Sequence, residues 1–318
     1  MEKLKNIQCV VASFADVSRF NLYYVDKTIY IPAIEKTRYI FFVRPRRFGK
    51  SMFISMLSLY YDIKPHKPFE ELFKGTWICD NRTEEQGKYM ILYFDFSGIR
   101  QSTDDIQEAF YTYCGWEIEE FLLKYKDIIS DDLSTKVRET HDLSQKLVIL
   151  ASGVREINQN LYVLIDEYDN FTNTLMSSGG QEKYKEITRQ NGFFKDFFRK
   201  LKELSGKDNP VIIRLFMTGV SPITLDDVSS GYNIGTNLSM RPEFNNLLGF
   251  TDKDVNDMLH YYISKGEFLI EKDKAIDTLK RWYDNYMFSD TATESMFNTD
   301  GVLYLLSSAM NQTKFPAK

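Results

Sequence analysis

One stretch, residues 39–61, constrains the fold of this chain more than any other. The apolar run Tyr39–Val43 predicts a buried parallel strand, and the apolar residues beyond the following turn recur at helical spacing. The turn closes with Gly49-Lys50-Ser51, the second half of a phosphate-binding loop. Glycine lets backbone amides approach phosphate oxygens, lysine reaches the terminal phosphates, and a serine hydroxyl can ligate Mg2+. The stretch therefore predicts a nucleotide phosphate site.

The loop departs from the standard pattern G-x-x-x-x-G-K-[ST], because Arg44 stands where the first glycine is expected. On this stretch alone, a basic surface turn that caps an ordinary helix is the alternative. The loop arginines also have more than one reading, as phosphate contacts, as part of a partner surface, or as solvated side chains. The residues expected to contact the nucleotide are Arg46, Arg47, Phe48, Gly49, Lys50, Ser51 and Met52.

Composition limits the class of protein. At 318 residues, with 43% apolar and 27% charged residues, the chain suits one large domain or a domain with an appendage. A net charge of −5 gives no general attraction to nucleic acid or membrane. Three cysteines without metal-ligand spacing indicate a reducing compartment. With no signal pattern and no long apolar stretch, the sequence predicts a cytoplasmic protein.

Two further strands end in polar residues that suit the chemistry of this loop. Leu161–Ile165 runs into Asp166-Glu167, where Asp166 would hold Mg2+ and Glu167 would polarise the water that attacks the γ-phosphate. The alternative is a pair of carboxylates that merely enter solvent. The strand over residues 210–217 ends at Thr218, the candidate γ-phosphate sensor, with Ser221 as the alternative. A hydroxyl that satisfies a strand-end turn would explain either residue equally simply.

The remaining elements complete an α/β pattern. Residues 88–97 predict another strand, residues 103–159 predict helices, and Asn245–Phe250 is the candidate fifth strand. Residues 29–35 predict a helix that either covers a nucleotide base or only packs against the core. From Thr251 the pattern is helical, beginning with a capping Thr-Asp-Lys-Asp sequence.

With these residues in place, the sequence resembles the bacterial AAA-ATPase-like family of P-loop NTPases. The resemblance covers residues 21 to about 300 and is carried by six ordered motifs: Tyr24–Thr28, Arg44–Ser51, Leu164–Asp169, Met217–Pro222, Leu248–Thr251 and Trp282–Phe288. In that family arginine replaces the first glycine of the loop, which implies that Arg44 is a family feature. Members usually continue into a PD-(D/E)XK-type nuclease domain, for which this chain has no room, so nuclease activity is not expected from it.

The fold we expect is a three-layer P-loop NTPase with a parallel sheet in the order 5-1-4-3-2 and a C-terminal helical lid. Residues 1–250 would form the ATPase core, and residues 251–318 the lid and the start of a linker. The site would lie at the carboxyl ends of the strands.

Three functions follow from this pattern. The first is Mg2+-dependent ATP hydrolysis, with Glu167, Lys50 and Thr218 as the catalytic residues and with Ser51 and Asp166 as the metal ligands. The second is an ATP-gated regulatory module that hydrolyses slowly and controls a nuclease or defence effector, and through that partner DNA. A small-molecule kinase is a third, weaker reading. The sequence does not fix the oligomeric state or an arginine finger, for which Arg214, Arg241 and Arg281 are candidates.

Overall fold

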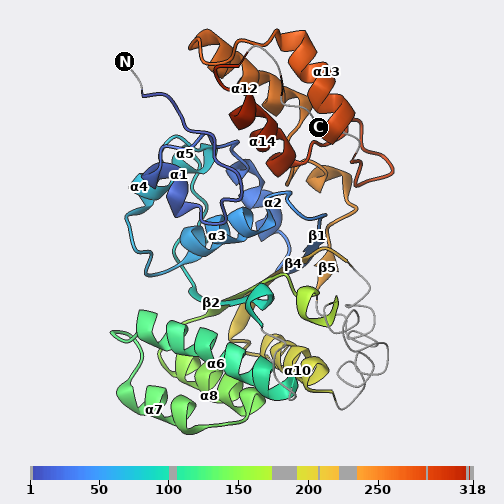
Figure 1. Ribbon diagram of the computed structural model, residues 1–318. Coiled ribbons are helices and arrows are strands. Elements are labelled where there is room, and N and C mark those ends of the chain that lie inside the picture. Colours follow the sequence, from blue (N-terminus) through green and yellow to red (C-terminus); the bar gives the residue numbers. More distant parts are fainter. Residues whose placement is uncertain are drawn as a thin grey trace.

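The chain is organised around a five-stranded parallel sheet (Figure 1). The computed structural model describes residues 3–99, 106–173, 192–206, 208–221, 235–283, 286–312 and 315. Pro222 and residues 284–285, which belong to two of the motifs above, lie outside this described part. The strands are β1 (Tyr39–Val43), β2 (Met90–Asp95), β3 (Leu161–Asp166), β4 (Ile212–Gly219) and β5 (Thr236–Asn237).

The strand order is β2-β3-β4-β1-β5, which reads 5-1-4-3-2 from the β5 edge. The sheet differs from our expectation in the identity of its fifth strand, which is Thr236–Asn237 and not Asn245–Phe250. Pro242 opens a short 3-10 helix, η3 (Pro242–Phe244), and Asn245 follows in helical conformation. Phe250 instead makes an isolated antiparallel bridge with Phe297. The apolar residues in this stretch therefore fill the core without joining the sheet.

Helices cover both faces of the sheet because the strand side chains alternate between two cores. Val163 and Ile165 face the core formed with α6, α8 and α10, whereas Tyr162 and Leu164 face the core formed with α2 and α3. The helical segments before the last strand are α1 (Ala15–Arg19), η1 (Thr28–Tyr30), α2 (Ile31–Glu35), α3 (Lys50–Tyr61), α4 (Phe69–Leu72), α5 (Trp77–Asp80), η2 (Phe96–Gly98), α6 (Ile106–Lys124), α7 (Asp131–Glu139), α8 (Leu143–Glu156) and α10 (Phe193–Ser205).

A third apolar core lies among the C-terminal helices α12 (Asp252–Ser264), α13 (Lys272–Tyr283) and α14 (Thr299–Ala309), at the top of Figure 1. The predicted capping start is confirmed: the Thr251 hydroxyl accepts from the Asp254 N–H, and the Asp254 carboxylate accepts from the Thr251 N–H. Within the described residues, no helix is both long and apolar enough to cross a membrane.

Arg44 is buried at the point where β1 leaves the sheet, with 1% of its surface exposed. Its guanidinium lies over the rings of Phe42 and Phe288, at 4.2 and 4.0 Å from their centroids. It donates to the carbonyl oxygens of Val43 and Ser239 at 2.8 Å and of Phe244 at 2.9 Å. No carboxylate in the described residues pairs with it, so aromatic faces and carbonyl dipoles stabilise its charge. Arg44 thereby joins β1 to the chain after β5 and to the C-terminal region.

Replacing Arg44 by glycine restores the standard loop pattern, and we nevertheless expect it to lower the free energy of unfolding by about 4 kcal/mol. The change opens a buried cavity and leaves carbonyl groups without their donor. The measurement is urea denaturation, with Arg46→Gly as the matched control. Arg46 is exposed on the same loop, so its change should cost about 1 kcal/mol or less. Equal stability of the two variants would show that Arg44 is not an anchor.

Candidate functional site

The loop between β1 and α3 has the backbone geometry of an anion site. Gly49 has φ +87°, and α3 begins at the next residue, so the helix N-terminus points unpaired N–H groups toward the space above the loop. Nothing lies within 4 Å of where a Cβ on Gly49 would stand, so glycine is required here by the backbone angle and not by crowding. Arg47 also has a positive φ, +68°, although it is not glycine. A strained backbone of this kind persists only where the surrounding contacts hold it.

Lys50 folds back over the loop. Its Nζ donates to the carbonyl oxygens of Arg44 at 3.2 Å and of Pro45 at 3.1 Å. Burial lowers the pKa of Lys50, an effect that the negative charges of Asp166 and Glu167 partly oppose. These weak carbonyl contacts leave the ammonium available for stronger, charge-assisted bonds to phosphate oxygens.

The carboxyl ends of β3 and β4 bring Asp166, Glu167 and Thr218 together. Pairing of Ile165 with Met217 makes Asp166 and Thr218 neighbours on adjacent strands. Each has 1% of its surface exposed, and within the described part of the chain each holds a buried oxygen without a hydrogen-bond partner: Asp166 Oδ2 and Thr218 Oγ1. Unsatisfied buried oxygens are uncommon and point to a missing ligand or ion. Glu167 follows with φ +49°, a left-handed conformation that is rare for a non-glycine residue.

Burial raises the pKa of the Asp166 carboxyl to about 6, while the Ser51 hydroxyl acts in the opposite direction. The carboxylates of Asp95 and Glu167 raise the pKa further, and Lys50 lowers it. The pKa of Glu167 is also raised, first by burial and then by nearby carboxylates. The site is therefore rich in negative charge and stabilised by the arrival of a cation.

These residues fit Mg2+. The ion takes hard oxygen ligands and binds nucleotide sites through one or two protein groups, with phosphate and water completing the shell. The Ser51 hydroxyl and the partnerless Asp166 oxygen supply such a pair. Among the described residues there is no group of three or more His, Cys, Asp or Glu that could hold a metal on its own. A magnesium ion here would thus rely on the nucleotide for its remaining ligands.

A cavity of about 330 Å³ opens beside the loop. Glu167 and the loop residues line one part of it, and the N-terminal segment and the C-terminal region line the rest, mostly with apolar side chains but also with Gln8, Lys27, Thr299 and Asp300. The lining includes Val10, Val11, Ala12, Leu22, Tyr23, Tyr24, Val25, Leu248, Phe250 and Leu303. One end suits phosphates, and the other suits a flat apolar group such as a nucleobase.

The structure places most, but not all, of the predicted site residues on this cavity. Its walls include Arg47, Phe48, Gly49, Lys50, Ser51, Met52 and Glu167. Asp166 and Thr218 are buried at the strand ends and do not line it, and Arg46 is exposed outside it. The ring of Phe48 packs edge-on against Tyr286 and Phe288, so this residue anchors the loop as well as lining the cavity.

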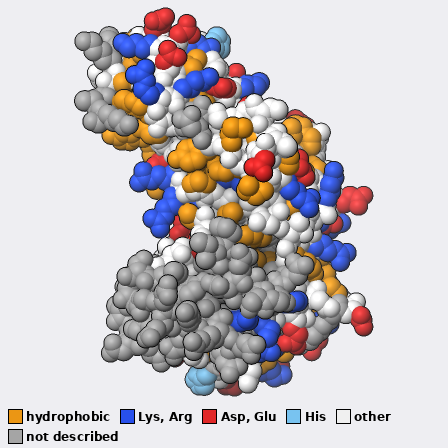
Figure 2. All heavy atoms as spheres, turned by 90° about the vertical axis from the view of Figure 1, so that its right-hand side faces the viewer, with side chains coloured by type: hydrophobic (Ala, Val, Ile, Leu, Met, Phe, Trp, Pro, Cys, Tyr) orange, Lys and Arg blue, Asp and Glu red, His pale blue; other side chains and the backbone are white. Residues whose placement is uncertain are grey.

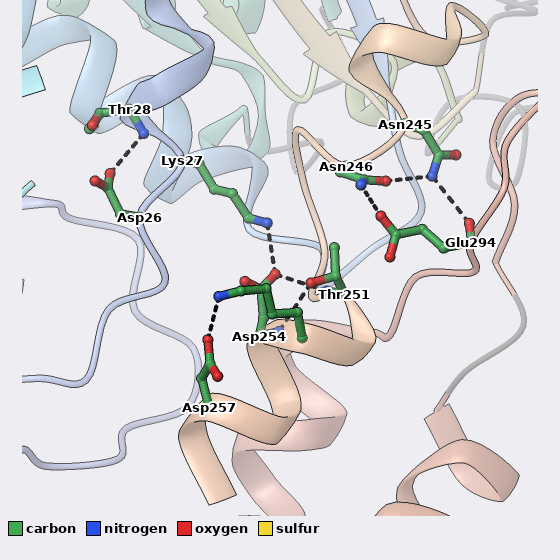
Figure 3. A network of polar contacts seen from close by, with 10 residues as sticks. Asp26, Lys27, Thr28, Asn245, Asn246, Thr251, Asp254, Asp257 and Glu294 are labelled. Atoms are coloured by element: carbon green, nitrogen blue, oxygen red, sulfur yellow. Dashed lines mark hydrogen bonds and ion pairs between the residues drawn. The ribbon is translucent and has the colours of Figure 1, made fainter. Parts of the chain in front are cut away.

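Two connections join the N-terminal segment that lines the cavity to the C-terminal helices. Lys27 reaches from the N-terminal segment to Asp254 on α12, at 3.0 Å (Figure 3). Asp300, at the start of α14, accepts from the Val10 N–H at 3.2 Å and lies 3.6 Å from the Arg47 guanidinium. The backbone N–H of Asp300 also donates to the Arg47 carbonyl. The strained loop residue is therefore held by α14.

The three candidate arginine fingers differ in position. Arg214 is buried near the amino end of β4, where it contacts Glu85, Tyr89 and the Glu35 carbonyl, so it does not reach the loop of its own chain. Arg241 and Arg281 are exposed, and Arg241 lies 3.8 Å from Glu243. The structure therefore excludes Arg214 as an arginine finger for the loop of its own chain.

Sequence reasoning missed three parts of the site. Asp95 pairs in register with Asp166 and adds a third carboxylate; like Asp166, it ends an apolar strand, a signal that was present in the sequence. Asp169 binds the end of β4, as described below. The contacts of Thr299 with Arg47 and of Asp300 with Val10 join residues 252 and 290 positions apart in the chain, and no local pattern predicts them.

Comparison with known proteins places the chain in a family. The family model described as "Predicted AAA-ATPase" matches residues 8–229, so the chain belongs to this family. It is also 25% identical over 303 residues to a protein of Azotobacter chroococcum mcd 1, which is described as an uncharacterized protein in the vnfD 5′ region. The match covers 92% of this chain and 51% of that relative, so the chain spans about half of the relative's length.

Replacing Asp166 by asparagine should stabilise the nucleotide-free protein. The carboxyl pKa rises from 3.8 to about 6 on folding. Stability is therefore lost as the pH rises through this interval, by up to about 3 kcal/mol, and the amide removes that loss. The gain should be full at pH 7.5 and should fade toward pH 4, as measured by denaturant unfolding at each pH. Asp290→Asn, on an exposed turn, is the control and should change stability by less than about 0.5 kcal/mol. A destabilised Asp166→Asn at pH 7.5 would contradict this account.

Proposed function

We propose that this protein binds and hydrolyses ATP with Mg2+. The observation that carries the proposal is the cavity that joins Lys50, Ser51 and Glu167 at one end to an apolar chamber at the other. Membership of the predicted AAA-ATPase family supports the same activity. The partnerless oxygens of Asp166 and Thr218, buried beside this end, support a bound ion and a γ-phosphate.

In this proposal the chain's own groups divide the work. Lys50 leaves the carbonyls of Arg44 and Pro45 and binds the terminal phosphates, together with the α3 amides. Ser51 and Asp166 hold Mg2+, which neutralises charge on the phosphates when bound. Glu167 accepts a proton from the attacking water or orients it, and the Thr218 hydroxyl contacts the γ-phosphate.

The other end of the cavity would hold the base. Tyr23, Tyr24 and Val25 line it from the N-terminal segment, and Leu248 and Phe250 line it from the C-terminal side. We propose that residues 1–250 act as the ATPase core and residues 251–318 as a lid, because the start of α14 contributes Thr299, Asp300 and Leu303 to the same cavity. Arg46 and Arg47 would add phosphate contacts at the rim.

A second candidate function is an ATP-gated regulatory module, and one observation favours it. Three groups at the start of α14 bind carbonyls of the phosphate loop: Asn298 Nδ2 donates to Arg46 O at 3.1 Å, Thr299 Oγ1 to Arg47 O at 2.6 Å, and Asp300 N to Arg47 O at 3.3 Å. A loop that shifts when phosphate binds would move this helix. The output would then be a nuclease domain, an effector or an oligomeric partner.

Any contact with DNA would in this view pass through that partner. On the face shown in Figure 2, Lys and Arg side chains are interspersed with Asp and Glu over the C-terminal helices, and hydrophobic side chains gather across the middle. On this face the charge over the C-terminal helices is mixed, unlike the basic patch or stripe that is typical of nucleic-acid-binding surfaces.

The first test is a thermal shift with Mg-ATP on three proteins: wild type, Lys50→Ala and Glu167→Gln. Ligand at 100 times Kd adds about 2.7 kcal/mol of stability, which corresponds to several degrees. Wild type and Glu167→Gln should shift, whereas Lys50→Ala should not. Phosphate release should then be found with wild type alone. No shift in any of the three would refute ATP binding by this chain.

Hydrogen exchange tests the regulatory candidate. In Glu167→Gln, which should retain ATP, Mg-ATP should slow amide exchange in α14 as well as in the loop, because α14 binds the loop carbonyls. Lys50→Ala supplies the control without nucleotide. Protection confined to the loop and α3 would show that α14 does not sense the nucleotide.

A further inference from the structure

The carboxylate of Asp169 connects the ends of two strands. Asp169 has 1% of its surface exposed, and it follows β3 by three residues. Its Oδ2 accepts from the Ser221 N–H at 2.7 Å, and both of its oxygens accept from the Val220 N–H, at 3.0 and 3.1 Å. Asn173 Nδ2 also donates to it, at 3.1 Å. The Val220 and Ser221 amides belong to the turn that follows Thr218 and Gly219, at the end of β4.

Tyr168 adds a second connection between the same strand ends. Its backbone N–H donates to the Thr218 carbonyl at 3.1 Å, and its hydroxyl donates to the Ser221 carbonyl. Gly219 lies between these contacts, where an added Cβ would stand 2.4 Å from both Asp169 Oδ1 and Tyr168 Cε1. The two strand ends are therefore packed without free space.

Glu167 lies inside this arrangement in a strained backbone conformation. Its φ is +49°, and its N–H donates to Asp166 Oδ1 at 2.8 Å. The residue before it is fixed in the sheet, and the two residues after it are fixed to the β4 end. Strain of this kind persists only where neighbouring contacts determine the backbone. The Asp169 contacts can do so together with two bonds nearer to Glu167, from the Tyr168 N–H to the Thr218 carbonyl and from the Asn170 N–H to the Glu167 carbonyl.

We propose that Asp169 is a positioning residue: by binding the Val220 and Ser221 amides, it holds Glu167 and Thr218 at the spacing that ATP hydrolysis requires. This inference rests on the proposed ATPase function. Both carboxylate oxygens of Asp169 already accept from protein N–H groups, unlike the unbonded oxygens of Asp166 and Thr218, so it acts on turnover through Glu167 and Thr218 and not through ATP binding. A misplacement of catalytic groups by about 1 Å costs about 100-fold in rate.

The test compares Asp169→Asn with wild type in Mg-ATP binding, steady-state hydrolysis and thermal stability. The amide keeps the shape, but its NH2 cannot accept from the strand-end N–H groups. We expect kcat to fall by about 10- to 100-fold, with the ATP Kd changed by less than about threefold; because buried N–H groups lose an acceptor, Tm should also fall by a few degrees, with the variant still folded at the assay temperature. Asn173→Ala is the matched control: it removes a donor to the same carboxylate while leaving the β4 amides bound, and it should keep kcat within about threefold of wild type.

A double-mutant comparison separates positioning from general support of the fold. In the Glu167→Gln background, Asp169→Asn should lower the residual rate little further, because both changes disable the same group. Tyr168→Phe removes only the hydroxyl contact and should lower kcat moderately at unchanged Kd, which keeps the idea testable if Asp169→Asn does not fold.

The outcomes are distinct. If wild type hydrolyses ATP and Asp169→Asn does so equally well, the positioning role is wrong while the proposed function stands. Loss of ATP binding and stability together with kcat would make Asp169 a structural residue only. If wild type itself neither binds nor hydrolyses ATP, the proposed function fails, and this inference fails with it.

Discussion

The guanidinium of Arg44 is the interaction on which the rest of this structure depends. In a standard phosphate loop the first position is glycine, and the backbone there is free to turn. Here the side chain is placed between Phe42 and Phe288 and bonded to the carbonyls of Ser239 and Phe244. Because these partners come from distant parts of the chain, one buried charge fixes the end of β1, the segment after β5 and the C-terminal region against one another. The phosphate loop thus begins from a rigid point.

The charged groups around the loop suit the binding of a charged ligand and do not favour the stability of the free protein. Asp95, Asp166 and Glu167 place three carboxylates at adjacent strand ends, and burial raises the pKa of two of them. Lys50 is a nearby cation, and it is engaged by carbonyl oxygens. Arg47 in the loop and Glu167 at the end of β3 both have positive φ angles, which are strained for residues other than glycine. Such costs are typical of sites whose stabilising partner is the ligand.

Short sequence patterns were sufficient to predict the strands and helix starts that neighbouring residues determine. An apolar run followed by the turn that contains Gly-Lys-Ser predicted β1, an apolar run that ends in Asp-Glu predicted β3, and the Thr251 box predicted the start of α12. The fifth strand was wrong, because Asn245–Phe250 has a strand-like composition but the turn that begins at Pro242 and the pairing of Phe250 with Phe297 take it out of the sheet. Asp169 reads in sequence as one more polar residue after a strand. Its role depends on β4 lying beside β3, which is a property of topology and not of spacing along the chain.

The contacts between the loop and α14 bear on how nucleotide binding could be felt elsewhere. The Lys50 ammonium binds the carbonyls of Arg44 and Pro45, and the start of α14 binds those of Arg46 and Arg47 in the same loop. In the proposed function, binding of phosphate by Lys50 would break its bonds to the Arg44 and Pro45 carbonyls, and the bonds from α14 would then hold a loop of changed shape. If that changes the equilibrium of α14, reciprocity requires that anything which binds α14 and its apolar core also changes the affinity for nucleotide. Such coupling needs no additional catalytic group in the C-terminal helices. It needs only the hydrogen bonds that the start of α14 already makes to the loop carbonyls.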